Sequence, residues 1–348
     1  MHFCCEFWTQ FVTILLTGLA VVVLVSALVL RLISTPVPVI HRTDSEHYYY
    51  DPKTKQRIKF PDLMDSSDHD EDGNRSSVYV SVVVPAFNEE KRLPIMLDET
   101  IHYLEGRCRE GSTPAPDHQV FTYEIIVVDD GSDDRTSEVA LDYCHRYGSE
   151  KIRVLTLEAN RGKGGAVRLG VMSSRGRLVL FADADGATKF TDFHKLEAFM
   201  WEKANSGREP IAIGSRAHLQ SEAVATRSLL RTILMYGFHV GVWLLAVRTV
   251  RDTQCGFKLF GRRMARVLFS HTHCQKWAFD VELLLIAERL DTNIGEIAVN
   301  WTEIEGSKVV PFWSWLQMGK DVAIISLKYT TGACRYPSLA SSSGHKSD

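Results

Sequence analysis

Five runs of apolar, mostly β-branched residues recur through the middle of the chain, and they constrain its fold more than any other feature. The first reads VYVSVVVP and the fourth reads RLVLFADAD. Unbroken runs of this kind are typical of parallel strands that are covered on both faces. Stretches of helical composition lie between them. The alternation predicts a doubly wound, mostly parallel α/β sheet. The strands are expected at 78–85, 123–130, 151–158, 177–185 and 209–216, and the helices at 90–103, 136–147, 163–173 and 192–203.

The fourth run stops at Asp183-Ala184-Asp185-Gly186. Ligands of doubly wound sheets bind outside the carboxyl ends of the strands. Alternate residues of an extended chain point the same way, so the two carboxylates can hold one hard divalent cation. Mg²⁺ typically takes one or two protein carboxylates together with substrate phosphates. A lone D-x-D is common in surface turns, and its position after a buried strand is what favours a metal site.

The first two runs also end in polar residues, PAFNEE and DDGSDDRT. A carboxylate at such a strand end, here Asp129 or Asp130, can accept hydrogen bonds from a base or a ribose. The alternative is helix capping, with Asn88 before the first expected helix and Ser132 or Asp133 before the second. Both interpretations can hold for neighbouring residues.

NRGKGGAVRLG, residues 160–170, follows the third run and opens a helix. Gly162, Gly164 and Gly165 would let backbone N–H groups approach an anion, and Lys163 would supply positive charge. The segment therefore has the composition of a phosphate cradle, although it matches neither a Walker A motif nor G-x-G-x-x-G.

The N-terminus is not globular, because residues 11–30 are almost wholly apolar. About 20 such residues span the hydrocarbon core of a bilayer. A cleaved signal peptide would have a basic start and a shorter apolar core, whereas here no Lys or Arg precedes the run, and Arg31 and Arg42 follow it. We therefore expect an uncleaved anchor, with everything after Arg31 on the cytosolic side.

Two later segments are apolar and aromatic. RSLLRTILMYGFHVGVWLLAV, at 227–247, is long enough to span a membrane, but its arginines, His239 and glycines fit a helix in the membrane interface at least as well. The segment at 309–329 places tryptophans beside lysines, a membrane-interface signature. For both segments the alternative is a buried core helix.

The expected organisation is an anchor at 1–33, an acidic flexible linker at 34–76, an α/β half that carries the strand-end motifs at 77–216, a membrane-interface half at 217–330 and a tail at 331–348. The formal net charge is −3, without a basic block, so nucleic-acid binding is not supported. The seven cysteines form no C-x-x-C pair, which suggests neither a disulfide framework nor a zinc site.

In this order and spacing, VVVPAFNEE, IVVDDGSDDRT, NRGKGGAVRLG and FADADGAT resemble the nucleotide-sugar half of family 2 glycosyltransferases with the GT-A fold. Together with GSRAHL, RDTQCGFKLF, WAFDVELL and NWTEIEGSKVVPFWSWLQMGKD, they resemble the dolichyl-phosphate β-glucosyltransferases over nearly the whole chain. The resemblance implies that 77–216 is the nucleotide-sugar-binding half and that 217–330 is the acceptor-binding half. That resemblance implies transfer of glucose, with inversion, from UDP-glucose to dolichyl phosphate at the cytosolic face of the endoplasmic reticulum membrane, for N-glycan precursor assembly.

The resemblance also implies residue roles. Asp183 and Asp185 would hold the Mg²⁺ or Mn²⁺ ion bound to the UDP diphosphate, with Ala184 between them, and the cradle of Gly162, Lys163 and Gly164 would face the phosphates. The uridine pocket would be lined by Pro85, Phe87, Glu89 and Asp130, with Asp129 beside it. Phe87 stands where relatives often have Tyr, and Ala187 stands where related mannosyltransferases often have Gln.

A phosphate acceptor is already anionic at neutral pH, with a second pKa of about 6, so no general base is needed to activate it. Arginines are expected to hold it by bidentate contacts; our candidates are Arg216, Arg227 and Arg231, and more weakly Lys308. Asp280 and Glu282 could supply a base or orient their neighbours, and we favour orientation. The alternatives are another donor such as GDP-mannose, a hydroxyl acceptor, and a non-catalytic nucleotide-sugar-binding subunit. Oligomeric state is left open.

Overall fold

The computed structural model of the chain describes residues 2–64, 78–111, 113–115, 119–219, 237, 240–304 and 311–338. Its centre is a seven-stranded sheet with the order β5-β4-β3-β6-β8-β7-β9. β8 pairs antiparallel with β6 and β7, and the other pairs are parallel. The strands are β3 (Val78–Ala86), β4 (Tyr123–Asp129), β5 (Ile152–Thr156), β6 (Gly176–Ala182), β7 (Pro210–Ser215), β8 (Phe257–Gly261) and β9 (Asn293–Ala298).

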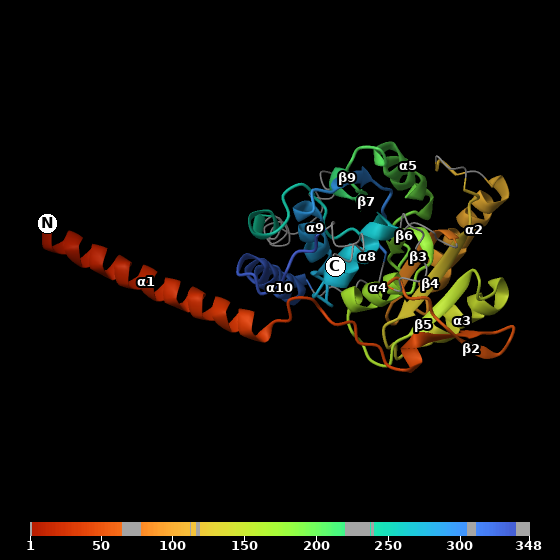
Figure 1. Ribbon diagram of the computed structural model, residues 1–348, viewed down its shortest axis with the longest axis horizontal. Coiled ribbons are helices and arrows are strands. Elements are labelled where there is room, and N and C mark those ends of the chain that lie inside the picture. The colour runs from red at the N-terminus through yellow and green to blue at the C-terminus, as the bar shows by residue number, and fades with distance from the viewer. Residues whose placement is uncertain are drawn as a thin grey trace, which may run out of the picture.

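Helices cover both faces of this sheet (Figure 1). One face packs against α4 (Lys163–Met172), α8 (Arg262–His271) and α9 (Phe279–Arg289). The other packs against α2 (Leu93–Glu110), α3 (Thr136–Tyr147) and α5 (Phe193–Lys203). The five expected strands and four expected helices are all present. α2 starts and ends later than expected, and its end is set by Gly111, which has φ +70° and provides the left-handed C-cap.

Strands β8 and β9 were not expected from the sequence, and they change the domain picture. β8 lies between β6 and β7, so the segment after residue 216 completes the sheet of the first half. Lys258 interrupts the apolar run of β8, yet it is fully buried because Asp280 of α9 neutralises it at 2.5 Å. A short strand with a central lysine does not look like a core strand until that distant partner is known.

The expected flexible linker differs from the structure in its first part. After η1 (Ser45–His47), β1 (Tyr48–Asp51) and β2 (Gln56–Lys59) form an antiparallel hairpin. Tyr49, Phe60 and Leu63 are buried in the same core as α4. These apolar side chains fix residues 45–63 to the domain, despite the polar composition around them. The acidic remainder of the linker lies outside the described residues.

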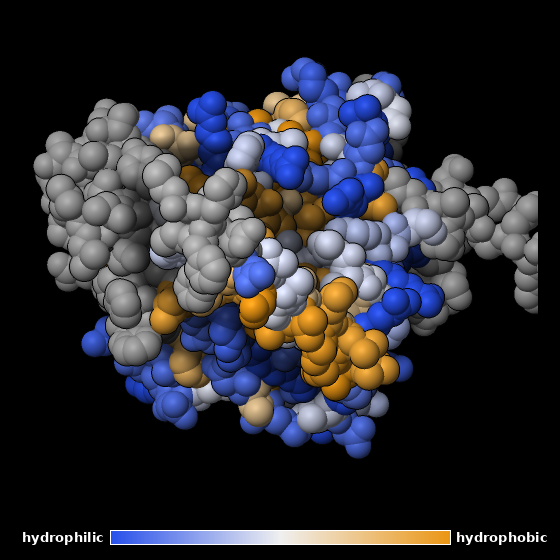
Figure 2. Space-filling view, turned by 90° about the vertical axis from the view of Figure 1, so that its left-hand side faces the viewer, coloured by the Kyte–Doolittle hydropathy of each residue, from blue (hydrophilic) through white to orange (hydrophobic). Residues whose placement is uncertain are grey.

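The N-terminal helix α1 (His2–Ile33) projects from the body as a long rod (Figure 1). Its part at Gln10–Ile33 is the one helical segment among the described residues that is apolar and long enough to cross a membrane. Figure 2 views the molecule from the side on which α1 projects and shows apolar surface in its central part. α10 (Pro311–Thr330) contacts α1 and buries Val322, Ile325 and Tyr329 while Leu316 is exposed. Two short 3₁₀ helices, η3 (Phe190–Asp192) and η4 (Ala217–Leu219), complete the fold.

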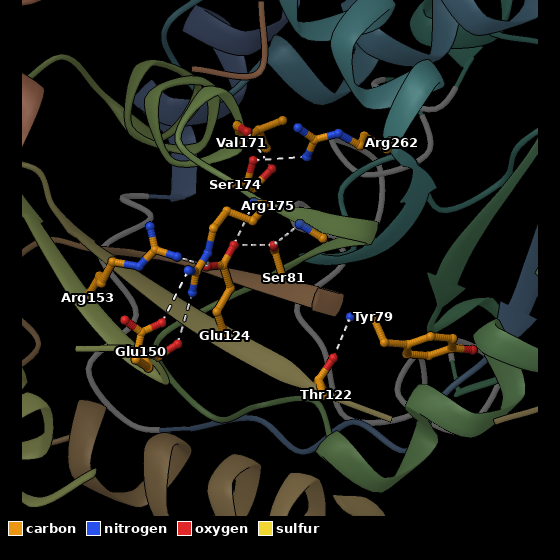
Figure 3. A network of polar contacts seen from close by, with 11 residues as sticks. Tyr79, Ser81, Thr122, Glu124, Glu150, Arg153, Val171, Ser174, Arg175 and Arg262 are labelled. Atoms are coloured by element: carbon orange, nitrogen blue, oxygen red, sulfur yellow. Dashed lines mark hydrogen bonds and ion pairs between the residues drawn. The ribbon is translucent and has the colours of Figure 1, made fainter. Parts of the chain in front are cut away.

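The amino ends of β3, β4 and β6 are joined by a buried polar network (Figure 3). Glu124 accepts hydrogen bonds from Ser81, Arg153 and Arg175. Ser81 in turn accepts the Gly176 N–H at 2.7 Å, and a Cβ at Gly176 would lie 2.4 Å from the Ser81 nitrogen. A buried carboxylate is tolerated because it is paired and fully hydrogen-bonded. This network stabilises the edge of the sheet opposite the strand ends where the candidate site lies.

Candidate active site at the carboxyl ends of the strands

The strand order reverses between β3 and β6, where chain connections leave the sheet in opposite directions. This switch point is where doubly wound sheets bind ligands. Asp183 and Asp185 follow β6 directly, and the loop after β3 carries Phe87 and Glu89. The motifs that were selected from sequence therefore meet at one edge, as the parallel strands require.

Lys163 lies over the D-x-D segment. It is the first residue of α4, and its Nζ is 2.7 Å from Asp183 Oδ1. Gly162, which precedes it, has φ +82°, and a Cβ there would lie 2.7 Å from the Gln275 carbonyl oxygen. Gly164 is equally confined, because a Cβ would meet Phe279 at 2.6 Å. The glycines thus let the loop pack against the segment that leads into α9 and direct Lys163 to the carboxylate.

Asp183 and Asp185 fit a divalent cation. Asp183 Oδ1 is buried and pairs with the Lys163 ammonium at 2.7 Å. Burial and the nearby Asp183 charge raise the pKa of Asp185, so a cation between the two would relieve a real electrostatic cost. Among the described residues no group of three or more His, Cys, Asp or Glu side chains could hold a metal by itself, so further oxygen ligands would have to come from a substrate or from water.

Asp129 and Asp130 have separate environments. Asp129 accepts hydrogen bonds from Ser132 and Ser137, which fix the turn after β4. Asp130 accepts the Arg161 N–H at 2.7 Å, so it ties the β4 end to the cradle loop. Burial, only partly offset by the backbone N–H groups of Arg161 and Gly162, raises the pKa of Asp130 to about 6. A buried carboxyl with a raised pKa at a strand end makes Asp130 a candidate for contact with a ligand.

The three candidate helix caps, Asn88, Ser132 and Asp133, instead form hydrogen bonds that join the loop after β3 to the loop after β4. The Asp133 N–H donates to Asn88 Oδ1 at 2.8 Å, and the Asn88 N–H donates to Ser132 Oγ at 2.9 Å. Asn88 adopts φ +53° to do so. Glu89, next to it, pairs with Arg92 through two contacts of 2.6 Å. The loops after β3 and β4 therefore form one unit beside Pro85 and Phe87.

Of the four acceptor candidates, the structure describes only Arg216; Arg227, Arg231 and Lys308 lie outside the described residues. Arg216 follows β7 and makes a bidentate ion pair with Asp252, with both contacts at 2.8 Å. Its guanidinium also lies 5.4 Å from the Trp301 ring centroid. Asp252, which lies in the RDTQCGFKLF motif but was assigned no role from the sequence, holds Arg216 in place at the same edge of the sheet as Asp183.

Asp280 is almost fully buried and its carboxylate contacts Lys258 Nζ. Burial raises the pKa of Asp280 against the opposing charges of Lys258 and Lys163. Glu282 accepts the backbone N–H groups of His273 and Cys274 and the Tyr329 hydroxyl. In these positions both carboxylates hold neighbouring elements in place, and the Lys258 partner was invisible in the sequence because it is distant along the chain.

Comparison with known proteins places the chain in a family. The model for glycosyl transferase family 2 matches residues 81–269. The chain is 53% identical over 336 residues to the dolichyl-phosphate β-glucosyltransferase of Drosophila melanogaster, which covers 95% of this chain and 98% of that one. It is 55% identical over 303 residues to the human protein of that name, covering 87% and 88% of the two chains.

A more distant likeness links the chain to a solved structure. This is glucosyl-3-phosphoglycerate synthase from Mycobacterium tuberculosis in complex with Mn²⁺, UDP and phosphoglyceric acid, at 19% identity and a TM-score of 0.46, covering 74% of this chain and 79% of that one. With the family match, the seven-stranded mixed sheet confirms the expected α/β fold class.

Proposed function

The chain belongs to the dolichyl-phosphate β-glucosyltransferases, enzymes of glycosyltransferase family 2, and from that premise we propose that it transfers glucose from UDP-glucose to dolichyl phosphate with inversion. The observation that carries the proposal is the meeting of Lys163, Asp183 and Asp185 at the switch point of the sheet. One ammonium and two carboxylates there suit a diphosphate bound together with a cation.

The donor would lie across the joined loops after β3 and β4. Its uridine would contact Pro85, Phe87, Glu89 and Asp130, and its diphosphate would face the cradle at Gly162, Lys163 and Gly164. Asp183 and Asp185 would hold Mg²⁺ or Mn²⁺, which when bound neutralises the charge of the departing UDP. Lys163 keeps the Asp183 carboxylate oriented, so the site is organised before the donor arrives.

The acceptor requires no base from the protein. A phosphate monoester is largely ionised at pH 7, and in-line attack then depends on position and on charge neutralisation. Arg216, held by Asp252, would orient the acceptor phosphate together with Arg227, Arg231 and Lys308. Asp280 would act as an orienting residue through Lys258.

The proposed location follows from the anchor and from the lipid. α1 would cross the endoplasmic reticulum membrane once, and the enzyme domain would face the cytosol, where UDP-glucose is available. Of the described residues in 227–247, Val240, Trp243 and Leu244 are exposed, while Val242 and Val247 are buried in the core. The exposed apolar side chains favour contact of this part of the segment with the membrane interface. The product would be dolichyl β-D-glucosyl phosphate for N-glycan precursor assembly.

The test is donor choice. Membranes that contain the chain are incubated with dolichyl phosphate and either UDP-glucose or GDP-mannose, and the lipid product is identified by mass. We expect a glucosyl lipid from UDP-glucose alone. A mannosyl lipid, or no lipid product from UDP-glucose, would contradict the donor assignment.

A further inference from the structure

The chain that leaves the membrane helix is bound along its length to the catalytic domain. We call residues 35–46 the strap; they run from the end of α1 past α4 to the β1–β2 hairpin (Figure 1). Carbonyl oxygens in the first part of the strap accept hydrogen bonds from the domain: Thr35 from His273 at 2.9 Å, Pro36 from the Arg335 N–H at 3.1 Å, and Pro38 from Arg168 at 3.3 Å. The strap is therefore an ordered part of the domain surface.

The last residue of the strap, Glu46, is fully buried in spite of its charge. Its carboxylate accepts the Thr43 N–H at 3.0 Å and the Glu158 N–H at 3.3 Å, and it pairs with Arg161 at 2.5 Å. The second terminal nitrogen of Arg161 donates to the His41 carbonyl oxygen. The Arg161 guanidinium is thus held on two sides by the strap, with good geometry for a buried carboxylate.

Arg161 belongs to the cradle loop. Its backbone N–H donates to Asp130 Oδ1, and the residues that follow are Gly162, in a left-handed conformation, and Lys163, which pairs with Asp183. The guanidinium of Arg161 is held by the strap and its backbone N–H is held by Asp130, so the backbone at this position has little freedom to move. The pairing of Glu46 with Arg161 is therefore one of the contacts that restrain the loop, together with its packing against residues 274–279.

We propose that Glu46 is a positioning residue of the donor site, so that the segment between the membrane helix and the domain is a working part of nucleotide-sugar binding. The proposal rests on the proposed function only in assigning the cradle loop to the donor. Glu46 touches no reacting atom; it acts through Arg161.

The test uses the full-length chain in membranes and measures the concentrations of UDP-glucose and of dolichyl phosphate that give half-maximal transfer. Glu46→Gln keeps the size of the side chain and removes its charge. We expect KM for UDP-glucose to rise by about tenfold or more, the loss typical of a hydrogen bond between charged groups, and KM for dolichyl phosphate to stay within about twofold.

A matched control separates positioning from general destabilisation. Glu197 is also a buried carboxylate paired with an arginine, Arg107, at 2.9 Å, and it contacts Tyr79 at the amino end of β3, away from the site. Glu197→Gln is expected to lower the thermal unfolding midpoint and to leave KM for UDP-glucose unchanged. If Glu46→Gln behaves in the same way, the proposal is wrong.

A double-variant cycle gives a second, independent readout. If Glu46 acts through Arg161, then Glu46→Gln combined with Arg161→Gln should raise KM no more than the worse single variant, whereas additive losses would contradict the proposal. Transfer by the wild-type chain tests the proposed function independently of the Glu46 proposal. Lack of transfer from UDP-glucose overturns the donor assignment, and the Glu46 comparison is then made with the nucleotide sugar that the chain does use.

Discussion

At Gly256, just before β8, the backbone passes so close to the site that a side chain does not fit. The Asp183 N–H donates to the Gly256 carbonyl oxygen at 3.0 Å, and a Cβ on Gly256 would lie 2.0 Å from Asp183 Oδ2. The carboxylate would have to move away from Lys163 and Asp185. The glycine is therefore needed for close approach to the site and not for an unusual backbone angle.

We predict that Gly256→Ala lowers transfer by at least about tenfold with little loss of folded protein, because it displaces the carboxylate that we propose as a metal ligand by an ångström or more. Rates in membranes, together with the thermal unfolding midpoint, check this. Gly106→Ala in α2 is the control, since nothing lies within 4 Å of its added methyl group. Unchanged transfer by Gly256→Ala would show that the position of Asp183 is not critical.

The raised pKa of Asp130 leads us to predict that donor binding depends on pH. Its folded pKa of about 6 lies above the usual value of 3.8 because the carboxyl is buried. Below pH 6 it gains a proton and loses its role as an acceptor, so KM for UDP-glucose should rise about tenfold between pH 7 and pH 5. UDP-glucose is the substrate to vary, because dolichyl phosphate itself titrates near pH 6.

Protonation of Asp130 has the opposite effect on stability: it weakens donor binding but stabilises the folded chain. Between pH 6 and pH 4 the folded state binds this proton more readily than the unfolded state, so the Asp130 contribution to the free energy of unfolding rises as the pH falls. Weaker donor binding at pH 5 is therefore not explained by this group unfolding the chain. Asp130→Asn should abolish the pH dependence of KM, and a wild-type KM that stays constant from pH 7 to pH 5 would contradict the assignment.

At this scale the sequence located Asp183, Asp185 and Lys163, because each follows the end of a recognisable strand. It assigned no role to Glu46, Asp252 or Lys258, although the last two lie in the RDTQCGFKLF motif. Their roles depend on partners that are distant along the chain, namely Arg161, Arg216 and Asp280. Spacing rules reveal residues that are local to one strand end and miss those that support them from elsewhere.

At the level of the secondary-structure elements, His273 links the strap to α9 and is a titratable group. His273 Nδ1 faces Glu282 at 3.1 Å and Nε2 faces the Thr35 carbonyl oxygen at 2.9 Å. Both partners accept hydrogen bonds, so the ring is best satisfied as a doubly protonated imidazolium. Burial lowers the pKa of His273, but hydrogen bonds to Cys334 and Glu282 and the charge of that carboxylate outweigh it and raise the pKa to about 9.

Because the folded pKa lies above the unfolded value of about 6.5, this stabilisation is fully present below pH 6.5 and is lost as the pH rises through 9. The difference corresponds to at most about 3 kcal/mol. We predict that the thermal unfolding midpoint of the detergent-solubilised chain falls by several degrees from pH 7 to pH 9.5. His273→Gln should start lower and fall less, and an equal fall in both proteins would exclude His273 as the cause.

The strands differ in how far they could be predicted from the sequence. The five runs identified β3 to β7 and the helices between them, because buried parallel strands are uniformly apolar. β1, β2, β8 and β9 are short, carry charged residues and take their stability from what packs on them, such as Tyr49 on Arg153 and Lys258 on Asp280. Such strands cannot be recognised before the fold is known.

For the molecule as a whole, the proposed orientation places both N-glycosylation acceptor patterns in the cytosol. These are Asn300, at the end of β9, where its side-chain amide donates to Asp192 at 3.1 Å, and Asn74, which lies outside the described residues. We predict no glycan at either site, and cleavage within the linker at 34–76 by protease added to sealed microsomes without detergent. A shift in gel mobility after endoglycosidase treatment would reverse the orientation.

The most direct test of the central claim is transfer by the intact chain with one carboxylate of the D-x-D neutralised. Asp185→Asn keeps the shape of the side chain and removes the charge that a divalent cation requires. In membranes with UDP-glucose and dolichyl phosphate, at matched protein levels and unfolding midpoints, we predict that the wild-type chain forms glucosyl lipid and that Asp185→Asn forms less than about 1% as much, a loss of at least about 2.7 kcal/mol of transition-state stabilisation. Transfer by Asp185→Asn at near the wild-type rate would contradict the account.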